Sequence, residues 1–157
     1  MTGGATVHAP AGMVASADHL ASSAGVGVLR DGGSAVDAAL AAAAVLAVTS
    51  PHMCGMGGDL FALVHRPGEP VAALCAAGRA GSGADPLQLR VEGYDLHVPA
   101  QGDIRAVTVP GCVDGWLELH RRFGRLPLSQ VFEPAITYAA AGFPACLLYT
   151  SPSPRDS

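Results

Sequence analysis

The run SAVDAALAAAAVLAVTS, residues 34–50, determines how this chain can be organised. Ser34, with Asp37 three residues later, resembles a capping box, the side-chain arrangement that opens a helix. Every residue from Ala38 to Val48 is apolar, so we expect a helix that is buried on most of its sides. Its many alanines allow neighbouring backbones to approach closely, and Ser50-Pro51 is expected to end it.

A second helix is predicted before this run. Asp18 can cap a helix that continues to about Arg30, because apolar residues recur at helical spacing between them. The segment 31–33, Asp-Gly-Gly, is expected to end it, since a glycine can take the left-handed conformation that helix ends often need. The short apolar segment Met13 to Ala15 predicts a small strand, and residues 1–11 are expected to be a flexible lead-in.

Strands and helices are both predicted after the central run. Two apolar segments, Leu60 to His65 and Val71 to Cys75, are joined by a turn-forming segment and predict a hairpin. The remaining elements are expected as a helix opened by Asp85-Pro86, a short strand at 107–109, and helices at about 113–123 and 129–141. This mixture predicts an α/β or α+β architecture.

The helix at about 113–123 is expected to bury one face. Val113, Trp116 and Leu117 share that face, with His120 on the same side. Trp116, together with Leu117 and Phe123, is interpreted as core and not as part of a binding surface.

Composition and charge argue against several classes of protein. The chain has 157 residues, a formal net charge of −4 and no lysine. A mildly acidic chain without a basic run predicts no binding to nucleic acid or to an anionic membrane. No signal peptide is visible, and the longest apolar run is about half the length of a membrane span. We therefore expect a soluble, cytoplasmic protein of roughly one domain.

The cysteines do not suggest a metal site. They are widely scattered and include no CxxC pair: Cys54, Cys75, Cys112 and Cys146. In a chain without a visible export signal they are interpreted as free, partly buried thiols. A zinc site built from His52 and Cys54 is disfavoured, because the spacing is wrong and no second pair of ligands follows.

The glycine-rich segment CGMGGD, residues 54–59, fits a nucleotide-binding loop poorly. Its glycines are not spaced as GxGxxG, a strand is expected after it where a helix should stand, and the chain has no lysine for a P-loop. The favoured interpretation is a tight loop that lets two layers pack. The alternative is a loop whose amide N–H groups face a substrate anion.

Few polar residues suggest chemistry by their pattern alone. Arg79 follows the second strand of the hairpin, and its guanidinium could bind a carboxylate through two parallel hydrogen bonds. The residue pattern alone nevertheless favours a solvated surface arginine. The six histidines are dispersed and there is no GxSxG motif, so no nucleophile–base pair stands out. Asp37 and Asp114 are interpreted as helix-start carboxylates and not as an acid–base pair.

Four collinear segments together resemble the large subunit of the gamma-glutamyltransferase family. They are GMVAS (12–16) with 21–38, which ends in LRDGGSAVDA; PHMCGMGGDLFALV (51–64); VPGCVDGW (109–116) with FGRLPL (123–128); and EPAI (133–136) with AGFP (141–144). The resemblance covers about residues 12–145. It implies an α+β fold, the αββα sandwich of N-terminal-nucleophile hydrolases, of which this chain would be an incomplete large-subunit fragment.

The resemblance also implies a reaction. Such enzymes cleave gamma-glutamyl amides, for example that of glutathione, through an acyl-enzyme formed on the N-terminal threonine of a small subunit. The small subunit comes from the same self-cleaving precursor, and no metal or organic cofactor is expected. Because that threonine is not among these residues, no catalytic residue is expected here, and the fragment is expected to be inactive alone.

Arg79 acquires a role through the resemblance. In the family, one arginine of the large subunit binds the α-carboxylate of the substrate, and Gly78-Arg79-Ala80 matches its position. Residues 81–84 depart from the usual continuation. Residues 55–59 match a branch that includes cephalosporin acylases, so a cephalosporin or glutaryl acylase is the alternative activity. A non-catalytic structural domain is the third interpretation.

Residues 146–157, CLLYTSPSPRDS, change abruptly to serine, proline and charge. They are expected to be a non-native tail after a family fragment at 1–145. The central helix is expected to be covered by polypeptide that is missing here, so the fragment alone is expected to be poorly soluble.

Overall fold

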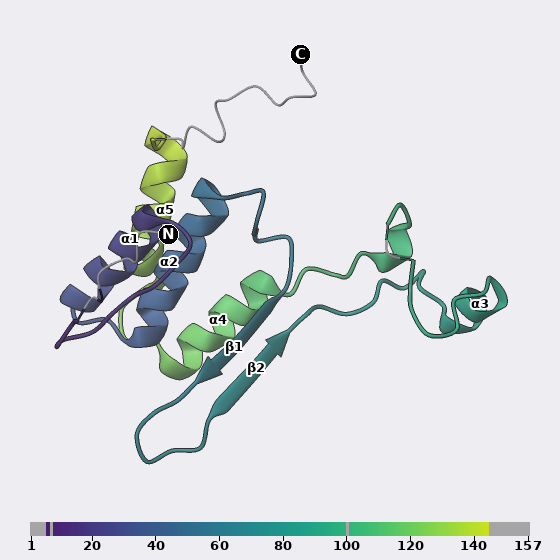
Figure 1. Cartoon of the computed structure of the whole chain (residues 1–157), viewed down its shortest axis with the longest axis horizontal. Coiled ribbons are helices and arrows are strands. Elements are labelled where there is room, and N and C mark those ends of the chain that lie inside the picture. Colours follow the sequence, from purple (N-terminus) through teal and green to yellow (C-terminus); the bar gives the residue numbers. More distant parts are fainter. Residues whose placement is uncertain (1–5, 7, 100, 145–157) are drawn as a thin grey trace. The chain divides into compact units, whose positions relative to one another are not determined.

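The computed structural model describes residues 6, 8–99 and 101–144, and Figure 1 traces its elements. The helices are α1 (His19–Arg30), α2 (Ala35–Thr49), α3 (Pro86–Val91), α4 (Cys112–Phe123) and α5 (Leu128–Ala141), with a 3-10 turn at Ile104–Ala106; the strands are β1 (Leu60–Val64) and β2 (Ala72–Ala76). The α+β prediction is confirmed. The chain divides into two compact units, one holding α1, α2 and α5 and the other holding the hairpin, α3 and α4.

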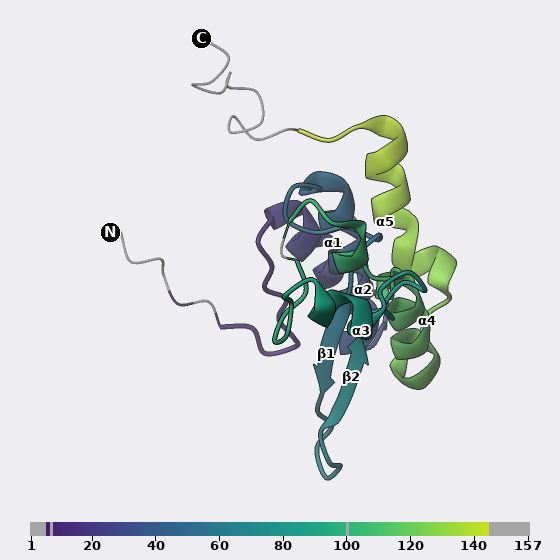
Figure 2. The ribbon, with the colours of Figure 1, turned by 90° about the vertical axis from the view of Figure 1, so that its right-hand side faces the viewer.

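Helix α2 is the core of the first unit. It packs against α1 and α5, as Figures 1 and 2 show. Leu40 and Val45 are 2% and 0% exposed, so the predicted burial of the central run is confirmed. Within the described residues α1 and α5 bury most of this helix, while Ala43 and residues 46–48 are half-buried. Cover from polypeptide outside these residues stays a prediction.

A glycine allows α1 and α2 to approach closely. A Cβ at Gly25 of α1 would lie 2.9 Å from the Ala38 carbonyl oxygen of α2 and 2.9 Å from a Val14 methyl group. Gly27, two residues further along the same helix, faces open space. Close packing of the two helices therefore depends on a glycine at 25 but not at 27.

Asp37 does more than cap a helix. The predicted capping box is present: Ser34 Oγ accepts a hydrogen bond from the Asp37 N–H (3.0 Å), and Asp37 Oδ2 accepts one from the Ser34 N–H (2.8 Å). The same Oδ2 also accepts from the N–H groups of Arg125 (2.9 Å) and Leu126 (3.3 Å). Burial alone would raise the pKa of Asp37, but the hydrogen bonds from these three residues outweigh it and lower the pKa. Asp37 therefore ties the start of α2 to the loop that leads into α5.

The hairpin of the second unit matches the prediction to within one residue at its strand ends. β1 and β2 pair antiparallel, with Leu60 opposite Ala76 and Phe61 opposite Cys75. Alternate residues are half-buried on one face and exposed on the other. Helix α4 contacts the half-buried face: a Cβ at Gly115 would lie 2.8 Å from the Ala76 Cβ and 3.0 Å from Leu60 Cδ2.

The predicted buried face of α4 is wrong in part. Trp116 is buried as expected, but Val113 and Leu117 are 44% and 47% exposed. Small residues are buried in their place, namely Cys112 and Gly115, along with Leu119. The physical reason is the close contact of Gly115 with the hairpin, which only small residues permit. Because the small residues face the hairpin, the larger Val113 and Leu117 are left partly exposed to solvent.

The segment between β2 and α4 is held together by local capping and charge pairs. Asp85 caps α3 through a bond from the Leu87 N–H, with Pro86 at the first helical position as predicted. Arg105 binds both Asp103 (2.6 Å) and Glu92 (2.7 Å), and its guanidinium lowers the pKa of Asp103 to about 2.

Two predicted strands are wrong. Residues 13–15 are irregular, and within 107–109 only Thr108 forms a bridge, an isolated antiparallel one to Ala80. A strand requires hydrogen bonds to a neighbouring strand over several residues. Neither segment has such a partner among the described residues. The predicted tail at 146–157 lies outside the described residues. Within the described part of the chain, no helix is both long enough and apolar enough to cross a membrane.

Candidate functional site

Arg79 lies just after β2, in a backbone segment that is held on two sides. Its carbonyl accepts a hydrogen bond from the Val109 N–H at 2.8 Å. Thr108 Oγ1 donates to the Ala77 carbonyl at 3.2 Å, and Ala80 forms the antiparallel bridge to Thr108. The hydrogen bonds come both before and after the arginine, so the direction in which its side chain leaves the backbone is determined by segment 107–109.

Two glycines make this arrangement possible. Gly78 has a φ of +82°, and a Cβ there would lie 1.9 Å from the Val109 carbonyl oxygen. A Cβ at Gly111 would lie 2.4 Å from the Ala76 carbonyl oxygen. A side chain at either position would push segment 107–111 away from the end of β2. The sequence contained a signal for this in Gly78 before the arginine and in Pro110-Gly111, but it did not show that each glycine faces the backbone segment that contains the other.

The glycine-rich turn before β1 forms hydrogen bonds to residues 111–112, next to the segment that holds Arg79. The Gly58 carbonyl accepts hydrogen bonds from the N–H groups of Gly111 (3.1 Å) and Cys112 (3.0 Å), where α4 begins. The Gly58 N–H itself donates to the Gly55 carbonyl at 3.3 Å. The turn therefore joins the start of β1 to the start of α4. These bonds support the packing interpretation of residues 54–59, and β1 follows the turn where a nucleotide-binding loop would have a helix.

The Arg79 side chain is exposed, and no described residue forms an ion pair or hydrogen bond with its guanidinium. Most other arginines of this unit bind carboxylates of the chain, for example Arg105 with Asp103 and Glu92, whereas Arg90, like Arg79, has no carboxylate partner among the described residues. The Arg79 guanidinium therefore keeps its donors available for an external carboxylate, which it could bind through two parallel hydrogen bonds.

In the part of the chain that the structure describes, the cysteines and acidic residues form no cluster that could hold a metal ion. The described cysteines are free thiols, but the expected partial burial is wrong for Cys54 and Cys75, which are exposed. Cys112 is buried, and burial first, then the nearby charges of Asp59 and Cys54, raise the pKa of its thiol. No group of three potential ligands gathers among the described residues, and Cys146 lies outside them. Asp114 lies exposed in the first turn of α4, as expected of a helix-start carboxylate.

The sequence profile of the gamma-glutamyltranspeptidase family matches residues 21–147. The chain belongs to this family. Among curated relatives, the glutathione hydrolase-like YwrD proenzyme of Bacillus subtilis is 44% identical over 133 residues, which are 84% of this chain and 25% of that protein. The oxamate amidohydrolase proenzyme of Klebsiella pneumoniae is 44% identical over 139 residues, 85% of this chain and 26% of that protein.

Solved structures of the gamma-glutamyltranspeptidase family share the fold. The gamma-glutamyltranspeptidase of Helicobacter pylori matches with a TM-score of 0.74 and 33% identity over 86% of this chain and 39% of that one. The cephalosporin acylase of Bacillus halodurans matches with a TM-score of 0.70 and 40% identity over 80% of this chain and 23% of that one. The resemblance to the family is thus confirmed. This chain spans about a quarter of the length of the curated relatives it matches.

Proposed function

We propose that this chain is part of a precursor that cleaves gamma-glutamyl amides such as that of glutathione, and that Arg79 binds the α-carboxylate of the substrate. The observation that supports the proposal is the exposed, unpaired guanidinium of Arg79 on a backbone fixed by Val109 and Thr108. A charge-assisted contact of this kind contributes about 1.5–3 kcal/mol. That is enough to make an arginine important for substrate binding.

The proposed reaction is acyl transfer. The hydroxyl of a threonine at the N-terminus of the small subunit adds to the carbonyl carbon of the amide, and its proton passes through the threonine's own α-amine. The C–N bond then breaks, the amine leaves with that proton, and a gamma-glutamyl ester remains on the threonine. Water hydrolyses the ester, or an acceptor amine takes the acyl group. Arg79 binds and orients the substrate in this scheme, which uses no metal or organic cofactor.

The test is a gamma-glutamyl anilide assay on the precursor that contains this chain, produced at the length of its relatives. We expect self-cleavage into two subunits, visible as two masses, and release of the aniline. The 157-residue chain is the control, and we expect it to release none because the threonine lies outside it. A precursor that neither cleaves itself nor turns over the anilide would contradict the proposal, and so would turnover by the 157-residue chain.

A second candidate is an amidohydrolase or acylase of the same family whose substrate has no α-amino group. It is favoured by the 44% identity to the oxamate amidohydrolase and the 40% identity to the cephalosporin acylase. Oxamate also carries a carboxylate beside its amide, so Arg79 could serve either substrate. Comparing kcat/KM for a gamma-glutamyl anilide, a glutaryl anilide and oxamate separates the candidates. A precursor that prefers either substrate without the α-amino group would favour the second.

A further inference from the structure

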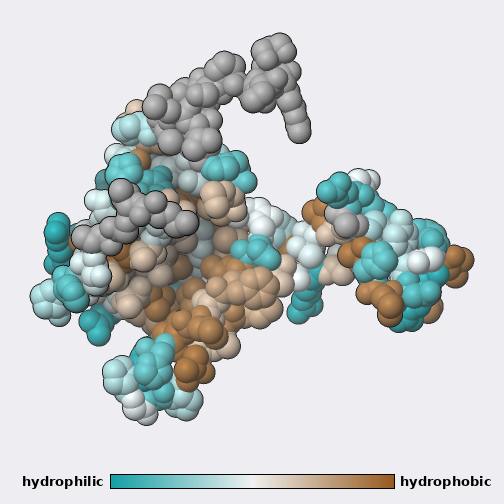
Figure 3. All heavy atoms as spheres, in the orientation of Figure 1, coloured by the Kyte–Doolittle hydropathy of each residue, from teal (hydrophilic) through white to brown (hydrophobic). Residues whose placement is uncertain are grey.

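The cysteines of the second unit lie in two different surroundings. Cys75 is exposed on the face of the hairpin opposite to the one that α4 contacts, where Figure 3 shows hydrophobic side chains gathered over the strands. Cys54 and Cys112 both lie where the glycine-rich turn meets the start of α4, and the first is exposed while the second is buried. The second pair therefore combines an accessible thiol with a shielded one at the same junction.

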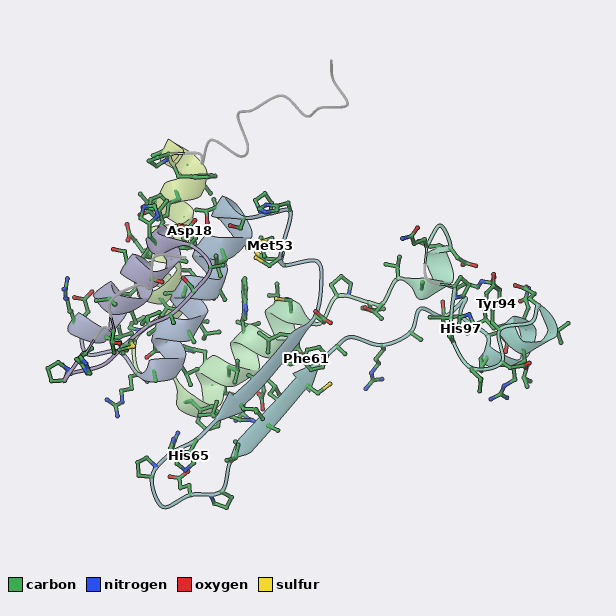
Figure 4. The ribbon with its side chains drawn as sticks, in the orientation of Figure 1. Asp18, Met53, Phe61, His65, Tyr94 and His97 are labelled. Carbon is green, nitrogen blue, oxygen red and sulfur yellow. The ribbon has the colours of Figure 1, made fainter. Side chains whose placement is uncertain are left out.

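Backbone hydrogen bonds bring Cys54 and Cys112 to this junction. The Gly58 carbonyl, near the end of the turn, accepts a hydrogen bond from the Cys112 N–H at 3.0 Å. The Gly58 N–H donates to the Gly55 carbonyl at 3.3 Å, so the turn folds back on itself just after Cys54. In Figure 4 the turn leads into the strand that carries the labelled Phe61. The chain between Cys54 and the partner of Cys112 is thus a single tight turn.

The electrostatics of the two thiols agree with this placement. Burial raises the pKa of the Cys112 thiol, and the charges of Asp59 and Cys54 raise it further. Salt screens the interaction of solvent-exposed charges beyond about 10 Å. Because Cys54 is exposed, its charge can influence Cys112 only from nearby.

The turn has the freedom to let the two sulfur atoms meet. A disulfide requires the two Cα atoms to lie about 4.4–6.8 Å apart. A Cβ at Gly55 or Gly57 would meet nothing within 4 Å, and glycine has the widest choice of backbone conformation. The path from Cys54 to Gly58 can therefore adjust while the hydrogen bonds from Gly58 to the start of α4 stay in place.

The two thiols also differ in the way that a reactive cysteine and its resolving partner differ. Cysteines that respond to oxidants are accessible to solvent and often lie next to a second cysteine that completes the reaction. Cys54 is exposed and can meet a peroxide, whereas Cys112 is shielded from solvent on the other side of the junction. Cys75 is exposed too, but it lies on the opposite face of the hairpin and serves as a natural control.

We propose that Cys54 and Cys112 form a reversible disulfide when a peroxide oxidises Cys54. The Cys54 thiolate attacks one peroxide oxygen, the O–O bond breaks, hydroxide leaves and a sulfenic acid remains. The Cys112 sulfur gives up its proton and attacks the Cys54 sulfur, the S–O bond breaks and water leaves. The hydroxide takes the proton that Cys54 lost, so hydrogen peroxide is reduced to two waters while the two sulfurs are oxidised.

The disulfide would lie beside the backbone that positions Arg79. Gly111 donates to the same Gly58 carbonyl as Cys112, and a Cβ at Gly111 would lie 2.8 Å from the Gly78 nitrogen. The inference itself does not rest on the proposed substrate, because the modification is detected by mass and not by turnover.

The test treats the folded precursor with hydrogen peroxide, blocks the remaining thiols with N-ethylmaleimide and maps the unreduced peptides by mass spectrometry. Chymotrypsin suits this chain, because it separates Cys54 from Cys75 by cleaving after Phe61. Trypsin would leave both in one peptide, since the bond after Arg66 precedes a proline. We expect a linked pair of peptides that contains Cys54 and Cys112, lighter by two hydrogen atoms than the reduced peptides, and its loss after dithiothreitol.

Single substitutions separate the roles of the three thiols. Dimedone traps sulfenic acids, and in Cys112→Ala we expect its labelling of Cys54 to rise by about tenfold or more, because the acid has no resolving thiol. Cys54→Ser changes an exposed position and should abolish the linked peptides without disturbing the core. Cys75→Ser is the matched control at a second exposed cysteine and should leave the yield of linked peptides unchanged.

The outcomes decide the proposal. Linked peptides of Cys54 and Cys112 that require both cysteines support it. Absence of these peptides after peroxide overturns it, and so does equal dimedone labelling of Cys54 in wild type and Cys112→Ala. A disulfide from Cys54 to Cys75, to Cys146 or to a second molecule also overturns it. A precursor that fails the anilide assay but forms the linked peptides would reject the proposed function and keep this inference.

Discussion

Replacing Asp37 tests how the first unit is held together. Its Oδ2 accepts hydrogen bonds from the N–H groups of Ser34, Arg125 and Leu126, and the residue is 0% exposed. Asp37→Asn keeps the shape but replaces charged acceptors by neutral ones. Hydrogen bonds to charged groups contribute about 1.5–3 kcal/mol and neutral ones about 0.5–1.5, so three weakened bonds should cost about 3–4.5 kcal/mol.

Two control substitutions should bracket the stability loss of Asp37→Asn. Ser34→Ala removes only the reciprocal helix cap and should cost about 1 kcal/mol. Asp37→Ala leaves the three amide groups without their acceptor and should cost more than Asp37→Asn, about 5 kcal/mol or more. Urea unfolding followed by far-UV circular dichroism measures all three. An Asp37→Asn variant as stable as the wild type would show that the charge of Asp37 does not strengthen these hydrogen bonds.

The pH dependence of the stability difference between wild type and Asp37→Asn tests whether the charge of Asp37 is what stabilises the fold. The folded pKa of Asp37 lies below its ordinary value of 3.8, so its contribution to stability is fully present above that pH. It is lost as the pH falls through the folded pKa, since the proton binds the unfolded state more tightly. The stability difference between wild type and Asp37→Asn should therefore be constant near neutral pH and shrink below 3.8. A difference that does not change with acidification would mean that the charge plays no part.

Two further predictions each compare a glycine in close contact with a nearby glycine that has room for a side chain. Gly27→Ala should stabilise α1 by about 0.5–1 kcal/mol, as in an ordinary helix, whereas Gly25→Ala should destabilise it because its Cβ meets the backbone of α2. Equal melting temperatures for the two variants would refute the close helix contact. Gly78→Ala combines a positive φ with a backbone clash and should raise the KM of the precursor, whereas Gly81→Ala, whose Cβ has only a carbonyl oxygen at 4.0 Å, should not. Unchanged KM in Gly78→Ala would show that the backbone at the end of β2 does not position the substrate.

Local signals predicted the elements of this chain well. The capping box at Ser34, the cap at Asp18 and the apolar runs of the hairpin act within a few residues, and the structure places the elements where these signals indicate. The burial of the central helix also followed, because a helix that is apolar all round has to be covered.

What the sequence did not predict depends on contacts between distant residues. The three-way role of Asp37 requires the loop at 125–126. The position of Arg79 requires Gly78 and Gly111, far apart in the sequence, to lie against each other's backbone segments. The buried face of α4 was misjudged for the same reason, since Gly115 fits against β1 and β2 in a way that hydrophobic periodicity cannot show. Distant partners decide these features, whereas caps and turns are decided by their neighbours.

Whether Arg79 binds the α-carboxylate of the substrate is tested by a two-by-two comparison on the processed precursor. Wild type and Arg79→Ala are each assayed with a gamma-glutamyl anilide and with the 4-aminobutyryl anilide, which lacks only the α-carboxylate. If Arg79 binds that carboxylate, its removal from the substrate lowers kcat/KM of the wild type by about 10- to 100-fold, the equivalent of one charge-assisted contact. The same removal should then change kcat/KM of Arg79→Ala very little. An equal loss in wild type and variant would show that Arg79 does not bind the α-carboxylate.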